Sequence, residues 1–563
     1  MISYTSKEKS TLTKVDMMWM LLIVVIYGIV SFINLGAFEN PQTFWSPKLS
    51  GDYAVISLNK EEYVEKIRHF TGPNFGKYKM YISSDNKNFK DIGELEQKKV
   101  FAWVDTPMNQ TFRYLAFKAK DPESFMGDVA LYDKEGKALQ VAYITKNAKE
   151  LVDEASVVPE KISYLNSTYF DEVYHARTAY EHINKMIPYE WTHPPLGKII
   201  IGLPVRILGM TPFAYRLMGE LAGIAMLIVI YILAKRMFSD ARYAVLASVL
   251  LAADTMHFVQ TRIATVDSFL VLFIMLSYLF IYQYIKCRDS DDLIIKLLNL
   301  FFSGVFIGAA IATKWSAMYG AVGLAIIFFI DFFKRMSNKY HNFIWKKQVF
   351  IIILSCFIFF MLIPFGIYIL SYSPFFETKF GTVNPFGEFI KLQQRMYKYH
   401  AELKATHPYS SPWYLWPLDI KPVWYYKGIV PKGLTATIVA IGNPIIWWSG
   451  IAAVFWLIKE VVVHRKQRDI FIIIALLALY LPYAFIPRVM FLYHYFPVVP
   501  FLILAVVSLL RHIVLTTKKP SMIKWYGMLA ILNFIFFYPI CSGMTIPTFY
   551  AVLTRWIPMW QFY

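Results

Sequence analysis

The chain has 563 residues, 57% of them hydrophobic and 18% aromatic, and a formal net charge of +18. Repeated apolar runs of about 20 residues are long enough to cross a bilayer as helices, which excludes a soluble protein and indicates a polytopic membrane protein. Most lysines and arginines flank these runs, so the charge indicates membrane topology, and nucleic acid is not expected as a partner.

The N-terminal region, residues 1–35, is expected to hold a short cytoplasmic segment and the first membrane span. The apolar run Met17 to Leu35 follows three lysines and has no small-residue cleavage site, so it is predicted to stay in the chain. The three cysteines lie far apart, in or beside apolar segments, which argues against a disulfide framework and a zinc cluster.

Residues 36–165 have a soluble composition and predict an inserted extracytoplasmic β domain in the first outer loop. Strands of alternating polarity are expected at Tyr78 to Ile82 and at Phe112 to Ala119. The order of three segments resembles discoidin-type β-sandwiches, many of which bind sugars: Lys79 to Asp85, Val100 to Trp103 and Arg113 to Phe117. A sugar-binding domain and a spacer without a ligand both fit this pattern.

Ten further apolar runs give about eleven predicted spans together with the first. They lie at residues 217–234, 243–259, 264–285, 295–313, 317–333, 348–371, 435–458, 470–487, 493–511 and 524–545. The run Leu196 to Met210 is short and carries two basic residues and a proline, so we expect an interfacial helix there. The remaining regions are a catalytic membrane module with interfacial helices (166–371), an outer aromatic-rich loop (372–434) and C-terminal transmembrane helices (435–563).

Span parity predicts that the polar features share one side of the membrane. With eleven spans, the basic clusters at alternate span ends all fall on the cytoplasmic side. The β domain and the polar turns between later spans are then extracytoplasmic. Since abundant Lys, Ile and Asn indicate an AT-rich genome, we expect a multi-pass protein of a bacterial plasma membrane with a cytoplasmic N-terminus.

Asp171 and Glu172 stand at the start of a predicted helix, in the polar stretch Tyr169 to His175. Acidic residues suit the positive end of a helix dipole, so a structural role is one interpretation. The other interpretation is catalytic. Asp171 and His175 share a helix face at positions i and i+4, and a partly desolvated carboxylate is able to take a proton from a hydroxyl acceptor.

The segment from His193 to Lys198 predicts a rigid turn, because its two prolines fix the backbone. Both end residues are candidate supporting residues for a substrate. The alternatives are that His193 only packs in the fold and that Lys198 extends to lipid headgroups.

Three basic residues at predicted outer span ends are candidate ligands for a lipid-linked phosphate: Arg262, Lys314 and Arg488. A cation at this depth is costly unless it meets an anion, and a guanidinium group binds phosphate through two hydrogen bonds. Asp267 follows Arg262 closely in the sequence. An ion pair that only joins two spans is therefore the alternative.

Four further residues near the same span ends are candidates for substrate binding: His407, Tyr409, Tyr493 and His494. The segment Gln393 to Tyr426 is rich in aromatics and prolines, which is typical of a membrane-interface belt and also of walls that bind sugar rings. For His494 a structural role is the simpler interpretation. No Walker loop, nucleotide-binding glycine fingerprint or zinc spacing is present, so no cofactor is expected and pumping driven by ATP is not supported. Asp171, Glu172 and His175 are the residues that could ligate a metal, and this alternative stays open.

These motifs resemble, in order, the protein O-mannosyltransferase family of polyprenyl-phosphate-dependent glycosyltransferases, particularly its bacterial members. The matching segments are Asp171 to Val173, His193 to Lys198, Gln260 to Arg262 with Asp267, Lys314-Trp315, His407 to Ser410, Gly442 to Pro444 with Trp447-Trp448, and Tyr493 to Pro497. The resemblance implies a C-type glycosyltransferase fold with its active site in the first outer loop. The soluble domain before the acidic pair departs from the family, and the lumenal repeat domain of the eukaryotic enzymes is absent. Sugar and acceptor therefore stay open.

The resemblance also implies roles and partners. Asp171 would activate the acceptor hydroxyl, with Glu172 beside it, and Arg262 would lie near the donor phosphate. We expect an inverting transfer of a sugar, mannose in the first instance, from a polyprenyl-phosphate donor to a hydroxyl of protein Ser or Thr. Lys314 or Arg488 would assist the leaving phosphate without a metal. Membrane lipids are further partners, and a dimer stays open beside a monomer.

Two alternative functions stay open. A related lipid-carrier-dependent transferase would decorate a cell-wall polymer or a lipid. A glycolipid transporter or flippase would use intramembrane charges as a substrate path, but here the ionisable groups cluster at one face and not at the bilayer midplane between repeats.

Overall fold

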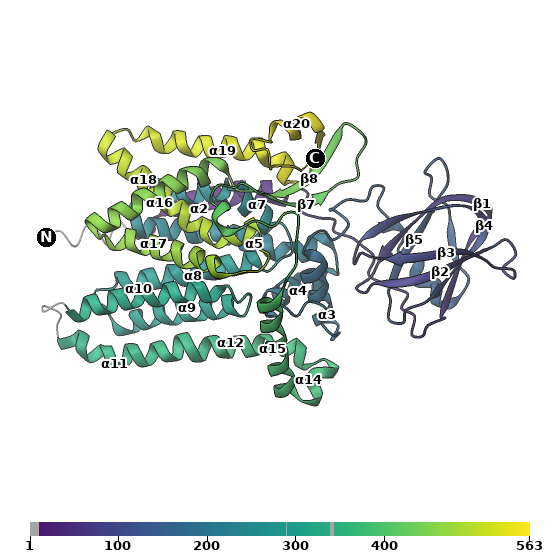
Figure 1. Ribbon diagram of the computed structural model, residues 1–563, viewed down its shortest axis with the longest axis horizontal. Coiled ribbons are helices and arrows are strands. Elements are labelled where there is room, and N and C mark those ends of the chain that lie inside the picture. Colours follow the sequence, from purple (N-terminus) through teal and green to yellow (C-terminus); the bar gives the residue numbers. More distant parts are fainter. Residues whose placement is uncertain (1–10, 289, 338–342, 563) are drawn as a thin grey trace. The chain divides into compact units, whose positions relative to one another are not determined.

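The computed structural model describes residues 11–288, 290–337 and 343–562 (Figure 1). The chain divides into two compact units. We call residues 34–189 and 201–217 the β unit, and residues 1–33, 190–200 and 218–563 the membrane unit. The division falls inside two helices, α4 (Leu196–Leu208) and α5 (Pro212–Phe238).

The β unit is built on a six-stranded sheet in the order β3-β2-β4-β1-β5, with β6 paired to β1. Its strands are β1 (Tyr53–Thr71), β2 (Gly76–Ser83), β3 (Lys90–Gln97), β4 (Trp103–Ala119), β5 (Met126–Tyr132) and β6 (Val141–Tyr143). The two strands named from the sequence are confirmed within β2 and β4. Two short helices, η1 (Lys146–Leu151) and η2 (Ala155–Val157), precede α3 (Glu172–Ile183).

The core of this sheet is centred on its longest strand, β1. Ile56 and Ile67 of β1 are fully buried against Phe117 of β4 and Leu131 of β5. Successive residues of a strand point to opposite faces, and in β1 residues 54–58 and 67–71 are all buried, so both faces of this strand are covered near its ends. The predicted β-rich insertion after the first helix is therefore confirmed.

Among the described residues, ten helical segments are long and apolar enough to cross a membrane, or eleven if the bent pair α6 and α7 is one span. A polytopic helical architecture is thus confirmed. The segments are α2 (Lys14–Phe32), α5, α6 (Ala241–Ala252) with α7 (Thr255–Thr261), α8 (Asp267–Lys286), α9 (Leu293–Ile311), α10 (Ala317–Ser337), α11 (Phe343–Phe357) with η3 (Ile358–Leu362) and α12 (Ile363–Ser371), α16 (Pro444–His464), α17 (Gln467–Tyr480) with η5 (Leu481–Phe485), η6 (Leu492–Val498) with α18 (Val499–Thr517), and α19 (Ser521–Cys541).

The span predicted from residue 435 is wrong at its start. Strand β8 (Leu434–Ala440) occupies these positions, because its β-branched residues favour an extended backbone. The helix begins later, at α16, where the Asn443 side chain accepts a hydrogen bond from Ile445 N and Pro444 stands in the first turn.

The region predicted as an outer loop, residues 372–434, contains regular structure. It holds α13 (Ser373–Phe376), α14 (Lys379–Val383), α15 (Pro385–Glu402), η4 (Trp413–Leu415) and β7 (Val423–Lys427). β7 pairs with β8, and β8 pairs with β9 (Thr545–Pro547), which α20 (Thr548–Leu553) follows. Within the membrane unit, α14, α15 and α20 lie at one end of the helix bundle (Figure 1).

Candidate active site

Asp171 lies at the start of α3 in the β unit, where it is the half-buried N-cap residue and makes no side-chain cap hydrogen bond. The preceding residue, Phe170, has φ +46°, a left-handed conformation that is strained for a bulky side chain. Such strain persists only where the surroundings hold the backbone. The fold, and not local preference, therefore determines where Asp171 is placed.

Contacts on both sides anchor this position. Ser167 Oγ accepts a hydrogen bond from Trp103 N at 3.1 Å, and Thr168 Oγ1 donates to Val100 O at 2.6 Å. One turn along α3, the N–H of His175 donates to Asp171 O at 3.0 Å, and the His175 side chain is buried. The predicted i and i+4 relation of Asp171 and His175 is thus that of a regular helical turn.

Glu172, predicted as a second catalytic carboxylate, is fully buried in an ion pair with Arg216. Nε and Nη2 of Arg216 lie 2.7 and 2.8 Å from the two carboxylate oxygens. The same guanidinium donates to Leu35 O at 2.8 Å and to Ser167 O at 3.2 Å. This bidentate geometry joins the start of α3 to the first turn of α5. Its direct effect is to hold the backbone beside Asp171.

In the membrane unit, Glu190 organises the predicted turn from His193 to Lys198. Its carboxylate accepts hydrogen bonds from Thr192 N at 2.8 Å and His193 N at 3.1 Å, and it lies 3.0 Å from His193 Nδ1. Lys198 Nζ is 2.5 Å from the same carboxylate and donates to the carbonyl groups of Glu190 and His193. Because Lys198 is only 1% exposed, the alternative in which it extends to lipid headgroups is wrong.

His193 faces a second histidine, His400 of α15, with 5.7 Å between the ring centroids. His400 Nε2 is 2.7 Å from Thr192 O, which fixes this nitrogen as the donor. Burial lowers the pKa of His193, and the charges of Lys314 and Lys198 lower it further. The Glu190 carboxylate acts in the opposite direction but does not reverse the shift. Burial, with the nearby cations, also lowers the pKa of His400 to about 4. Both rings are therefore neutral at pH 7.

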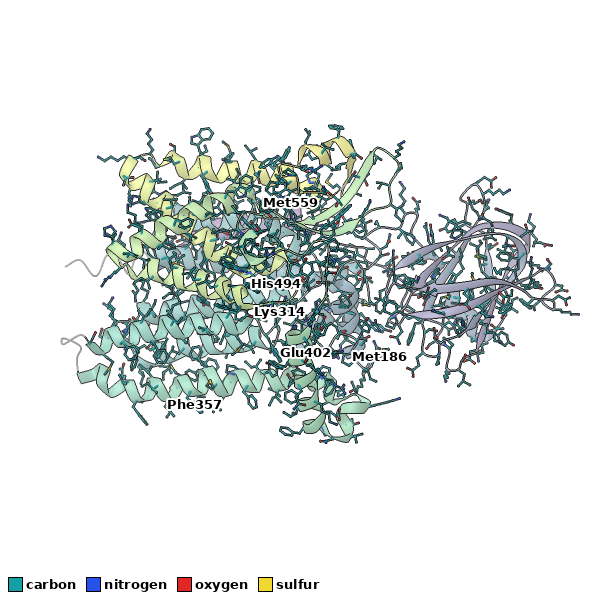
Figure 2. The ribbon with its side chains drawn as sticks, viewed as in Figure 1. Met186, Lys314, Phe357, Glu402, His494 and Met559 are labelled. Atoms are coloured by element: carbon teal, nitrogen blue, oxygen red, sulfur yellow. The ribbon has the colours of Figure 1, made fainter. Side chains whose placement is uncertain are left out.

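Lys314 lies in the turn between α9 and α10 and is 8% exposed. Its Nζ is 2.8 Å from Asp267 Oδ1, at the start of α8, and 5.9 Å from the centre of the Tyr493 ring. Figure 2 shows His494 close to Lys314. Among the described residues the bond to Asp267 is the one hydrogen bond of this ammonium group, which has three donors. Two donors are thus available to an anion.

Arg262 ends α7 and is 6% exposed. Its Nη2 donates to Ile33 O at 2.6 Å, and its guanidinium carbon lies 4.7 Å from the centre of the Phe258 ring. The side chain therefore contacts the C-terminal end of α2. Asp267 forms an ion pair with Lys314. The alternative drawn from the sequence, an ion pair between Arg262 and Asp267, did not include Lys314.

A cavity of about 750 Å³ opens between the segment that follows α15 and the segment that follows η5. His407 lines it from the first segment and Arg488 from the second. Tyr409 N donates to His407 Nδ1 at 3.2 Å, and the ring of Tyr409 is 6.4 Å from that of Trp424. Tyr409 is not among the residues that line the cavity, but its ring lies 5.8 Å from that of His407. The volume of the cavity suits a small-molecule ligand.

Most of the predicted residues belong to the membrane unit, whereas Asp171, Glu172 and His175 belong to the β unit. Three site residues were not evident from the sequence: Glu190, Arg216 and His400. Arg216 is 44 positions from Glu172, and no local pattern connects them. Glu190 had a usable signal, because a carboxylate just before a Pro-Pro turn is well placed to bond the turn's N–H groups.

The helix bundle with these buried cations has a counterpart among solved structures. The S. cerevisiae protein O-mannosyltransferase Pmt1-Pmt2 complex bound to the sugar donor matches with a TM-score of 0.62 at 13% sequence identity. The match covers 69% of this chain and 89% of that chain. The protein is therefore a polytopic membrane protein with the C-type glycosyltransferase fold.

Sequence comparison gives the family. The model for dolichyl-phosphate-mannose-protein mannosyltransferase matches residues 207–380, and that for the C-terminal four TMM region of protein-O-mannosyltransferase matches residues 385–560. The polyprenol-phosphate-mannose–protein mannosyltransferases of Mycolicibacterium smegmatis and Mycobacterium tuberculosis are 24% and 25% identical. These matches cover 66% and 70% of this chain and 82% and 86% of the relatives. The chain belongs to the protein O-mannosyltransferase family and is a membrane glycosyltransferase.

Proposed function

We propose that this enzyme transfers mannose from a polyprenyl-phosphate donor to hydroxyl groups of proteins. The names of the mycobacterial relatives support the donor and the acceptor class. The structural observation that carries the proposal is Lys314. A buried ammonium group with Asp267 on one side, the Tyr493 ring nearby and two remaining donors suits a lipid monophosphate.

In the proposed reaction Asp171 takes the proton of the acceptor hydroxyl as the hydroxyl oxygen bonds to the anomeric carbon of the sugar. The bond between this carbon and the phosphate oxygen breaks, the electron pair leaves with the phosphate, and the configuration inverts. Lys314, Arg262 and Arg488 are the proposed partners of the leaving phosphate, because fixed cations stabilise charge that develops in the transition state.

The remaining residues have supporting roles in this proposal. Glu172 holds the start of α3 through Arg216, and Glu190 holds the turn that carries His193. The neutral His193 and His400 offer hydrogen bonds to a sugar hydroxyl without adding charge. His407 and Tyr409 offer a polar and aromatic wall for the acceptor.

We also propose the finer topology that the sequence indicates: eleven spans, a cytoplasmic N-terminus, a bacterial plasma membrane and an extracytoplasmic β unit of discoidin-like type. The α6 and α7 pair as one bent span supports the number eleven. The amphipathic composition of α4 supports an interfacial helix.

The test is in vitro transfer of radiolabelled mannose from polyprenyl-phosphate mannose to envelope proteins by the purified chain. We expect label in protein that mild alkali releases, as a Ser or Thr O-glycoside would. Label that appears only in a cell-wall polymer or in lipid would instead support the alternative acceptor. Asp171→Asn should lose the transfer, since the amide cannot take the proton.

A further inference from the structure

We propose that the β unit binds a divalent cation, Ca²⁺ by the chemistry of its ligands, between Asp128, Asp153 and Glu154. One carboxylate oxygen from each residue lies within 4.8 Å of the others. Ca²⁺ binds oxygen at about 2.3–2.6 Å, so two of its ligands lie up to about 5 Å apart. The three oxygens are spaced as ligands of one such ion.

Asp128 on β5 provides independent evidence for a ligand. The residue is 0% exposed, and its buried Oδ2 has no hydrogen-bond partner among the described residues. Its other oxygen accepts a hydrogen bond from Glu154 N at 3.0 Å, which holds the carboxylate against the turn at residues 153–154. Buried carboxylate oxygens are nearly always paired, because desolvation without a partner is unfavourable. A cation among the three carboxylates would supply that partner.

Residues 42 and 43, which precede β1, hydrogen-bond the carboxylates of Asp153 and Glu154. Thr43 Oγ1 lies 3.0 Å from Asp153 Oδ1 and 2.9 Å from Glu154 Oε2. The N–H groups of Gln42 and Thr43 donate to Glu154 Oε2 at 2.8 and 2.9 Å. These contacts order both side chains but bring no positive charge. In the part of the chain that the structure describes, no lysine or arginine forms an ion pair with any of the three acids.

The ligand set selects the class of ion. Three carboxylates are hard oxygen donors, which favour Ca²⁺ or Mg²⁺ over metals that bind imidazole or thiolate. Ca²⁺ fits better, because it accepts irregular geometry and further carbonyl or water oxygens, whereas Mg²⁺ requires near-octahedral ligands at about 2.0–2.1 Å. The ion would join β5 to the turn at residues 153–154. None of these residues has a role in the proposed transfer reaction.

Binding of ⁴⁵Ca²⁺ to the full-length chain in detergent, stripped with EGTA, tests this site. Titration to about 10 mM exceeds the range of the weakest extracellular Ca²⁺ modules. The variant is Asp128→Asn, and the matched control is Glu135→Gln, an exposed acid of the same unit. We expect one Ca²⁺ per chain in the wild type and the control, and affinity at least about tenfold lower in Asp128→Asn.

Thermal unfolding of the same proteins is the second readout. In EGTA we expect Asp128→Asn to unfold at or above the temperature of the wild type, since the amide removes a buried charge. Added Ca²⁺ should stabilise the wild type and the control only. If Asp128→Asn does not fold, Asp153→Asn is judged by the same criteria. The proposal is overturned if the wild type binds no Ca²⁺ in this range, or if the variant binds it as tightly as the wild type.

Discussion

The start of α3 and the turn between α9 and α10 both set a buried carboxylate against a cation, but in different ways. Arg216 makes four hydrogen bonds, two to Glu172 and two to backbone carbonyl groups. Lys314 makes one, to Asp267, among the described residues. The fold uses nearly all the donors of the arginine, whereas most donors of the lysine remain for a ligand.

The number of unused donors distinguishes the structural pair, Glu172 with Arg216, from the proposed binding pair, Asp267 with Lys314, better than burial does. Glu172 and Asp267 are both buried, and both have a basic partner. A buried ion pair is weak evidence for either role, because desolvation offsets much of the attraction. The number of donors left after the fold is satisfied is the more informative quantity.

The largest expected effect is loss of folded protein on breaking the structural pair. Glu172→Gln and Arg216→Met each leave one buried charge without its partner, which costs about 3–5 kcal/mol. We expect a strongly reduced yield of monodisperse protein in size-exclusion chromatography. The double variant should recover part of the yield, because it removes both charges. Single variants that fold as the wild type does would show that this pair does not hold α3.

The second prediction concerns the binding pair. Lys314→Met combined with Asp267→Asn removes both charges and should preserve folding. The double variant should bind the donor more weakly, because a hydrogen bond to a charged group contributes about 1.5–3 kcal/mol. This loss corresponds to a rise of roughly tenfold or more in KM for the polyprenyl-phosphate sugar. Donor-dependent initial rates measure this change. An unchanged KM would contradict a phosphate role for Lys314.

The sequence predicts those parts of the candidate site whose residues are close together in the sequence. It does not predict contacts between residues that are far apart in the sequence. The acidic pair, the Pro-Pro turn and the basic residues at span ends were visible as local motifs. Their partners were not, because tertiary packing brings Arg216 to Glu172 and His400 to Thr192. For the fold, hydropathy located the helices well, but it assigned the apolar strand β8 to a span, since a short apolar run has no helical period of its own.

A smaller effect is expected at the cavity. Arg488→Gln removes a half-buried cation that lines the cavity from the segment after η5, and we expect little change in unfolding temperature. We expect KM for the donor to rise by a few fold, about 1 kcal/mol, and kcat to fall as well, because the same charge stabilises the leaving phosphate. Arg488→Lys keeps the charge and should restore most of the affinity. Equal donor KM in all three proteins would place the donor phosphate elsewhere.

A further effect, seen only at acidic pH, is expected on the pH dependence of stability. The pKa of His400 is lowered to about 4 in the folded chain, against about 6.5 when unfolded. The unfolded chain therefore takes up a proton first as the pH falls, and His400 destabilises the fold progressively from about pH 6.5 to about pH 4. His400→Gln, which keeps a donor for Thr192 O, should show a smaller fall in unfolding temperature over this range. An equal fall would show that other groups dominate.

The most direct test of the proposed transferase is the turnover number of Asp171→Asn. Asparagine has the size and shape of aspartate, and Asp171 makes no side-chain cap hydrogen bond that the change would remove. The variant should therefore fold with an unchanged unfolding temperature and bind the donor as the wild type does. We predict that kcat for mannose transfer falls by about 10²–10⁴-fold, the usual contribution of a general base. A kcat within about twofold of the wild type would contradict Asp171 as the base.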